Sequence, residues 1–227
     1  EFGFHESMPI YAGGLGILAA DYCKAMSNLW VPFVGVGLLY RQGYFTQHIG
    51  CDGEQIALYN SSDPIDLPVQ PAVDDRGNEL RVRVELDDHE LELRVWQVKA
   101  GSIKLFLLDS DLPANAPHER MITAQLYGGD HTMRLRQEIV LGIGGVRALR
   151  ALGIEPTVWH MNEGHSALLS LERLRERMAR TEESFEQALR GIGAEAVFTT
   201  HTPVPAGNET FDRHLMHKYL APWAEHA

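Results

Sequence analysis

The sequence has only two cysteines, Cys23 and Cys51, in 227 residues. Two thiols cannot build a disulfide framework, so we expect a reducing, cytoplasmic environment. No apolar run approaches the roughly 20 residues that a membrane-spanning helix needs. Positive charge is scarce, because 20 Lys and Arg face 31 Asp and Glu, which gives a formal net charge of −11. This balance argues against a nucleic acid or an anionic membrane surface as the main partner.

The chain also lacks an initiating Met and a polar C-terminal tail. It begins directly with Glu1-Phe2-Gly3-Phe4 and stops at Ala227, so we interpret it as a piece of a longer protein. Its hydrophobic fraction of 44% and charged fraction of 22% are typical of a soluble globular fold. A length of 227 residues suits one large domain or two small ones.

The most informative feature is the glycine cluster Gly13-Gly14-Leu15-Gly16, which an apolar run with helical spacing follows over residues 17–29. This order predicts a tight turn that opens a helix. The first turn of a helix presents free N–H groups and a partial positive charge, which suit a phosphate or a polar sugar. A purely structural turn is the alternative, since a glycine cluster alone is weak evidence for a ligand.

Beyond the glycine cluster, short apolar runs alternate with helical patterns, which favours an α/β fold. Buried strands are expected at residues 31–39, 157–160 and 196–200. Helices are expected at residues 137–152, 164–180 and 184–191, with Asn162 as the N-cap of the second. Glycines in the centre of the first helix predict close packing against a neighbour.

Residues from about 64 to 108 have a different, β-rich character. Residues 80–86 and 91–96 alternate strictly around a turn at 87–89, which predicts a hairpin, and residues 102–108 predict a third strand. This region is either an insertion or an antiparallel extension of the main sheet.

Polar residues follow two of the predicted strands, in the segments 160–165 (HMNEGH) and 199–203 (TTHTP). Because ligands collect at the carboxyl ends of strands in open parallel sheets, these segments and the glycine turn predict one cleft. Glu163 and His165 are candidates for binding hydroxyl groups. His160 is interpreted as a buried, hydrogen-bonded strand residue, and His201 either as a general base or as a residue that acts through its backbone.

A metal site is not favoured. The spacing His-x-x-Glu-x-His of residues 160–165 differs from the helical zinc patterns, in which the ligands meet on one helix face. Residues 127–131 (YGGDH) predict a mobile loop with Asp130 at an acidic tip, or else a plain solvated turn. Arg134 and Glu138 are spaced as a pair on one helix face.

Taken together, these segments resemble the α-glucan phosphorylases, in particular the shorter bacterial and archaeal type. The resemblance rests on EFGFHESMPIYAGGLGILAADYCKAMSNL, VPFVGVGLLYRQGYFTQ, YGGDHTMRLRQEIVLGIGG, WHMNEGHSALLSLERL and VFTTHTPVPAGNETF. It implies a Rossmann-like N-terminal half (residues 1–227) of a two-lobed GT-B glycosyltransferase, with the β-rich region of residues 64–108 as an insertion. The C-terminal cofactor lobe would be absent from this chain and would be its natural partner, while homo-oligomer formation stays open.

The resemblance also implies the reaction, a reversible phosphorolysis in which orthophosphate releases the terminal α-1,4-linked glucose of a glucan as glucose 1-phosphate. Pyridoxal phosphate takes part through its phosphate group. The family's cofactor lysine lies in the C-terminal lobe, and no lysine of this chain has a matching context. The fragment is therefore expected neither to bind the cofactor as an imine nor to turn over. The four lysines are Lys24, Lys99, Lys104 and Lys218.

Carried over residue by residue, the resemblance gives Gly14 a backbone N–H bond to the phosphate, with Gly13 and Leu15 lining the sugar. His201 would hold the 6-hydroxyl of the glucose through its backbone carbonyl, close to the reacting centre.

Four further positions complete the carried-over site. Asp130 matches the acidic residue of a gate loop, and Glu1 matches a carboxylate of the active-site region. Glu163 and His165 stand where better-known members have Asp-Thr-His, so their roles are less directly transferred.

Two other interpretations stay open. The chain could be the N-terminal lobe of a sugar-nucleotide-dependent glucan synthase, whose glycine loop also follows its first strand. It could also be a non-catalytic glucan-binding module, which exposed aromatic platforms would support. We instead expect the four tryptophans to be mostly buried or structural: Trp30, Trp96, Trp159 and Trp223.

Overall fold

The computed structural model describes residues 1–201 and 209–225. The chain divides into two compact units, and each is described by itself. The first unit comprises Glu1–Ala72 and Arg94–Gly128, and the second comprises Val73–Leu93 and Gly129–Ala227. Within the described residues, no helix combines the length and the apolar character required to cross a bilayer.

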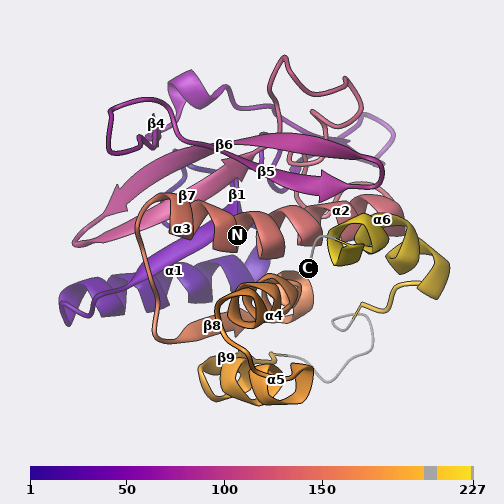
Figure 1. The fold of residues 1–227 in the computed structure, drawn as a ribbon. Helices are drawn as coiled ribbons and strands as arrows, with labels where there is room; N and C mark the ends of the chain where they lie inside the picture. The colour runs from indigo at the N-terminus through magenta and orange to yellow at the C-terminus, as the bar shows by residue number, and fades with distance from the viewer. Residues whose placement is uncertain (202–208, 226–227) are drawn as a thin grey trace. The chain divides into compact units, whose positions relative to one another are not determined.

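The first unit is built on a mixed sheet with the strand order β1-β7-β6-β4 (Figure 1). Strand β1 (Val34–Leu38) runs parallel to β7 (Ile103–Asp109), which in turn pairs antiparallel with β6 (His89–Ala100). The short β4 (Gln70–Pro71) lies at the edge. Strand β7 is mostly apolar and has neighbours on both sides, so all of its residues except Lys104 are buried.

Helix α1 (Gly13–Asn28) packs beside β7, and its buried side consists of small residues, Gly16, Ala20 and Cys23. The helix begins at Gly13, so the glycine cluster forms its first turn instead of a separate turn before residue 17. The rest of the unit contains an antiparallel hairpin of β2 (Thr46–Ile49) and β3 (Gln55–Leu58), and a 3-10 turn at Pro64–Asp66.

The second unit contains the predicted hairpin, formed by β5 (Arg81–Leu86) and the start of β6. Alternate residues of β5 are buried because side chains on a strand point to opposite faces. Since β6 continues into the pairing with β7, this region is an antiparallel extension of the sheet that contains β1. The hairpin and the mixed α/β character are confirmed.

The helices of the second unit follow in sequence order. Helices α2 (His131–Ile139) and α3 (Gly145–Ala151) are joined by a π-helical turn, Val140–Gly144, so the predicted helix at 137–152 starts earlier and is interrupted. Helix α4 (Leu169–Arg180) follows a 3-10 turn at Gly164–Ser166 and packs against α5 (Phe185–Ala194). Helix α6 (Arg213–Glu225) packs against β5 and α2.

Two strands of the second unit, β8 (Trp159–Asn162) and β9 (Ala196–Thr199), form a separate parallel pair. They were expected to be buried, but each strand has exposed residues: His160 on β8, and the adjacent Val197 and Phe198 on β9. The prediction that His160 is buried is therefore wrong, although it is hydrogen-bonded as expected. A two-stranded sheet leaves its faces open unless other elements cover them.

Two further expectations are corrected. Asn162 does not cap the following helix, because Glu163 occupies the N-cap position of the 3-10 turn. Trp30 is 81% exposed, whereas Trp96 and Trp159 are buried as expected; the side chain of Trp223 lies outside the described residues.

A buried carboxylate joins three elements of the second unit. Glu172 of α4 is fully buried and accepts hydrogen bonds from Arg147 of α3 and from Arg175 one turn further along α4. Arg147 also pairs with Glu85 of β5 at 2.7 Å. Burial of a carboxylate is costly unless it is paired and hydrogen-bonded, and here two guanidinium groups satisfy it.

The close packing that the central glycines predicted is confirmed at Gly142 in the π-helical turn. A Cβ atom at Gly142 would lie 2.6 Å from the backbone nitrogen of Leu169 and 2.8 Å from the carbonyl carbon of Leu168. The helical segments can approach this closely only because position 142 has no side chain.

We expect Gly142→Ala to lower the free energy of unfolding by about 1–3 kcal/mol, because backbone atoms must move to make room. Gly193→Ala in α5 is the matched control, since nothing lies within 4 Å of its added Cβ. It should raise stability by about 0.5–1 kcal/mol through helix propensity. Urea unfolding followed by circular dichroism measures both, and equal effects of the two substitutions would contradict the packing explanation.

Candidate functional site

The carboxyl ends of β8 and β9 carry a cluster of hydrogen-bonded polar residues in the second unit. The parallel register pairs Asn162 with Thr199, so both strands end at the same level. His160 Nε2 and Thr199 Oγ1 are 2.6 Å apart, and the backbone N–H of Glu163 donates to the carbonyl of Thr199 at 2.9 Å. We call this set the strand-end cluster: His160, Asn162, Glu163, Thr199 and His201.

His201 is fixed at two points of the strand-end cluster. Its backbone N–H donates to Glu163 Oε1 at 2.5 Å, and its ring Nε2 lies 2.5 Å from Asn162 Oδ1. Since the amide oxygen of Asn162 accepts, that ring nitrogen carries the proton. The side chain of Asn162 therefore orients a histidine ring instead of capping a helix.

Glu163 combines three unusual properties. Its φ of 66° lies in the left-handed region, which a residue with a side chain seldom adopts. Its side chain is 2% exposed, and its Oε2 is buried with no hydrogen-bond partner among the described residues. Strain and an unsatisfied buried oxygen at one residue are typical of a functional site.

The glycine turn of the first unit leaves the start of α1 open. Gly13 has a φ of +59°, and nothing lies within 4 Å of a Cβ added at Gly13 or Gly14. The N-cap residue, Ala12, offers no side-chain acceptor to the free N–H groups of the first turn. Gly13 and Gly14 are exposed and Leu15 is half-buried, so their backbone is accessible to a ligand.

Glu1 is held beside this turn. Its Oε2 accepts from the backbone N–H of Ala12 at 2.7 Å, and its Oε1 accepts from the hydroxyl of Tyr127. A carboxylate at the start of a helix interacts favourably with the helix dipole. The structure therefore places Glu1 next to the glycine cluster.

Asp130 lies in the second unit and is exposed. Its Oδ1 accepts from the backbone N–H of Met133 at 2.9 Å, so the carboxylate is the N-cap of α2. Arg134, expected to face Glu138, donates to Glu209 at 3.0 Å and to Gln137 at 3.2 Å.

The predicted site residues thus fall into two groups. Glu1, Gly13, Gly14 and Leu15 belong to the first unit. Asp130, Glu163, His165 and His201 belong to the second unit. The structure joins Glu163 directly to His201 by a hydrogen bond, and His165 is half-buried in the 3-10 turn that follows Glu163.

Sequence reasoning missed the ring contact of Asn162, the hydroxyl of Thr199 and the contact of Tyr127 with Glu1. Asn162 and Thr199 were recognisable as polar residues at the ends of strands, but the register that pairs them is a tertiary property. No local signal marks Tyr127, which is 126 positions from its partner.

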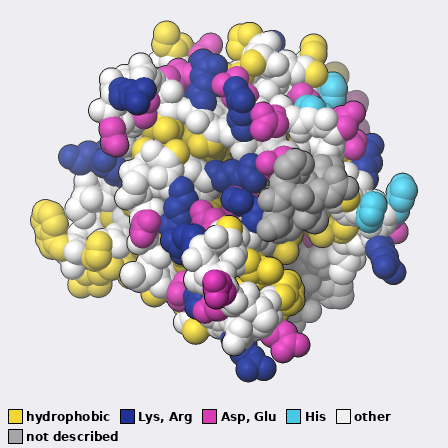
Figure 2. All heavy atoms as spheres, viewed as in Figure 1, with side chains coloured by type: hydrophobic (Ala, Val, Ile, Leu, Met, Phe, Trp, Pro, Cys, Tyr) yellow, Lys and Arg dark blue, Asp and Glu magenta, His cyan; other side chains and the backbone are white. Residues whose placement is uncertain are grey.

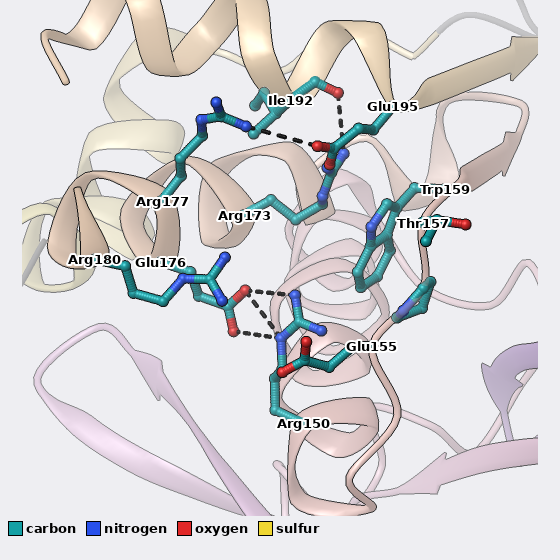
Figure 3. Close-up of a pocket in the computed structure, with 11 residues that line it drawn as sticks. Arg150, Glu155, Thr157, Trp159, Arg173, Glu176, Arg177, Arg180, Ile192 and Glu195 are labelled. Atoms are coloured by element: carbon teal, nitrogen blue, oxygen red, sulfur yellow. Dashed lines mark hydrogen bonds and ion pairs between the residues drawn. The ribbon is translucent and has the colours of Figure 1, made fainter.

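A separate pocket of about 250 Å³ lies between α3, α4 and α5 (Figure 3). Ion pairs line this pocket. Arg150 pairs with Glu176, with 3.0 Å between nitrogen and oxygen, and Arg173 pairs with Glu195 beside the ring of Trp159. Burial lowers the pKa of Arg173.

The charges of this pocket are largely balanced within it, so it resembles a structural ion-pair network. Acidic and basic side chains are similarly interspersed over the face in Figure 2.

A second hollow, of about 450 Å³, lies in the first unit beside Trp96. The indole N–H of Trp96 donates to Asp109 at 3.1 Å, and the guanidinium of Arg94 covers its ring. Neither pocket is lined by any described residue of the predicted site. Over the same described ranges, no three His, Cys, Asp or Glu side chains gather as they would around a metal ion.

No family model matches the chain, but comparison with known proteins gives relatives, and the following three are all named as phosphorylases. The maltodextrin phosphorylase of Thermococcus litoralis is 44% identical over 227 residues, which is 99% of this chain and 27% of the relative. The glycogen phosphorylase of Mycobacterium tuberculosis is 46% identical over 226 residues, 97% of this chain and 26% of the relative. That of Aquifex aeolicus is 37% identical over 216 residues.

This chain is related to the α-glucan phosphorylases. It spans only about a quarter of the length of the first two phosphorylases, so it corresponds to a segment of a phosphorylase sequence. The resemblance to the α-glucan phosphorylases that the motifs indicated is confirmed, and the two relatives described first come from an archaeon and a bacterium.

Glu138 is a buried carboxyl group of α2 with an altered proton affinity. Burial, the largest cause, and the nearby Glu209 together raise its pKa to about 8, while Arg134 opposes both effects. A carboxylic acid that stays protonated in the folded protein can donate a hydrogen bond to the neighbouring carboxylate.

The pKa of Glu138 predicts a stability loss as pH rises. Between its normal value of 4.5 and about 8, the folded state binds a proton that the unfolded state releases, so unfolding becomes easier with increasing pH. Glu138→Gln should remove about 1–3 kcal/mol of this pH dependence. Urea unfolding at pH 5, 6, 7 and 8 measures the free energy of unfolding at each pH. If this free energy falls with pH equally steeply in the variant and in the original protein, the prediction is refuted.

Proposed function

We propose that this chain is the N-terminal lobe of an α-glucan phosphorylase. The full-length enzyme would cleave the terminal α-1,4-linked glucose of a glucan with orthophosphate and release glucose 1-phosphate. The observation that carries this proposal is the match of at least 97% of the chain to relatives named maltodextrin and glycogen phosphorylase. In the same proposal the fold is a Rossmann-like half of a GT-B enzyme, which the parallel β8–β9 pair with polar carboxyl ends supports.

We assign the phosphate to the glycine turn. Gly14 would donate its backbone N–H to the phosphate, with Gly13 and Leu15 lining the sugar. The open space above Gly13 and Gly14 and the lack of a side-chain cap support this role, because an anion is the natural partner of free N–H groups at a helix start. Glu1, held beside the turn, would face the same ligands.

We assign the glucose to the carboxyl ends of β8 and β9. His201 would bind the 6-hydroxyl through its backbone carbonyl, and His165 would bind a sugar hydroxyl. Asp130 would lie on a loop that closes over the ligands. The rigid hold on His201 supports its role, since a binding group must keep its geometry when the substrate arrives.

The cofactor that the resemblance implies is pyridoxal phosphate, and this chain offers it no suitable lysine. A lysine that forms an imine needs a pocket that lowers its pKa, whereas all four lysines here are exposed. Two of them also pair with carboxylates, Lys24 with Asp21 and Lys218 with Asp87. We therefore assign the cofactor lysine to the part of the enzyme beyond this chain.

The proposed partner within the enzyme is its own C-terminal lobe. Exposed apolar side chains support a covering partner: Leu29 and Trp30 are 70% and 81% exposed after α1, and Phe198 of β9 is 51% exposed. A second copy of the enzyme is the alternative cover. The free cysteines, Cys23 and Cys51, support a cytoplasmic location.

The decisive experiment gives the full-length enzyme maltodextrin and orthophosphate and measures glucose 1-phosphate. We expect release by the full-length enzyme and none by the 227-residue chain, which lacks a cofactor lysine. Glucan elongation from a sugar nucleotide without phosphorolysis would favour the synthase alternative. Tight binding of maltoheptaose by the isolated chain, with no activity in the full-length protein, would favour a glucan-binding module.

Gly14→Ala tests the phosphate assignment. Because nothing lies within 4 Å of the added Cβ, the substitution should leave the fold intact, yet the methyl group enters the space assigned to the ligand. We expect kcat/KM for orthophosphate to fall roughly 10- to 100-fold with unchanged thermal stability. Gly193→Ala is the control for a helical glycine outside the site, and unchanged kinetics of Gly14→Ala would remove the assignment.

A further inference from the structure

We propose that Glu163 is a positioning residue, which holds the backbone of His201 and does not itself bind the sugar. The inference rests on the proposed function, because it assigns Glu163 a task in presenting His201 to the glucosyl unit. It also revises the expectation that Glu163 binds a hydroxyl group of the substrate.

The first argument is the direct contact. Glu163 Oε1 accepts from the backbone N–H of His201 at 2.5 Å, across 38 positions of sequence. A bond from an N–H group to a carboxylate is charge-assisted and stronger than a bond between neutral groups. It ties the residue after β8 to the second residue after β9, where the chain leaves the sheet.

The second argument is burial. With 2% of Glu163 exposed and its Oε2 buried, a sugar hydroxyl could reach neither carboxylate oxygen without displacing protein atoms. His201, in contrast, is exposed. The residue available to a ligand is thus His201, and Glu163 lies behind it.

The third argument is cost. A buried carboxylate oxygen with no donor among the described residues and a φ of 66° both destabilise the fold, and they occur at the same residue. The positive φ directs the chain out of β8, and the side chain then reaches β9 instead of capping the following 3-10 turn. Such costs persist where a function requires the resulting geometry.

His201 is held at its ring as well as its backbone, since Asn162 binds the ring Nε2. Loss of the Glu163 bond alone should therefore leave the ring attached while the backbone gains freedom. This separates a positioning role from a general loss of structure.

The test uses the full-length enzyme with Glu163→Ala, Glu163→Gln and the control Glu176→Gln, whose side chain pairs with Arg150 in another pocket. Alanine removes the acceptor, whereas glutamine keeps a carbonyl that can accept the same N–H. We expect kcat to fall about 100-fold in Glu163→Ala and less than about 10-fold in Glu163→Gln, with the control unchanged. Equal losses in both Glu163 variants, expressed mainly in KM for glucan, would indicate direct sugar binding and overturn the proposal.

A coupling measurement tests the route through His201. In the synthesis direction, the original enzyme should prefer glucose 1-phosphate over 6-deoxyglucose 1-phosphate, because His201 binds the 6-hydroxyl. In Glu163→Ala this preference should shrink toward one, since two changes that disrupt the same contact are not additive. A preference equal to that of the original enzyme would overturn the proposal.

Hydrogen exchange separates this inference from the proposed function. The backbone amide of His201 should exchange at least about tenfold faster in Glu163→Ala than in the original protein or in the control. If the amide of His201 exchanges faster in Glu163→Ala but the original enzyme shows no phosphorolysis, the positioning role of Glu163 stands and the proposed function is rejected. Unchanged exchange would overturn the positioning role, whatever the activity.

Discussion

The parallel pairing of β8 with β9 is the constraint on which the candidate site depends. Parallel strands end at the same edge, so the polar residues after β8 and after β9 meet although they are almost 40 positions apart. The pairing is short, four residues on each strand, and it is reinforced beyond the sheet by side chains. The hydrogen bond from the His201 backbone to Glu163 extends the contact past the last ladder position.

The two units offer different kinds of groups for binding a ligand. The first unit offers backbone: an uncapped helix start, exposed glycines and open space above them. The second unit offers side chains that are held in hydrogen bonds before any ligand arrives. Backbone N–H groups suit an anion, and preorganised polar groups suit the hydroxyls of a sugar.

Much of the local structure was predictable because it follows from periodicity. The alternation over residues 80–96 gave the hairpin, the apolar run before residue 39 gave β1, and Ser184 introduces α5 through a capping box. Errors arose where a residue had more than one local use. The side chain of Asn162 can cap a helix or bond a distant histidine, and the sequence does not distinguish these two uses. The π-helical turn after α2 leaves no distinct signal in the sequence.

The sequence by itself determined the α/β character, the glycine-rich helix start and the relationship to the phosphorylases, because each depends on residues that are close together in the chain. Only the tertiary structure decided that Glu163 is buried and bonded to the His201 backbone, that His160 is exposed, and that Tyr127 contacts Glu1. These properties depend on strand register and on contacts over long separations. A sequence pattern records which residues are polar, but not which polar groups satisfy one another when they are buried.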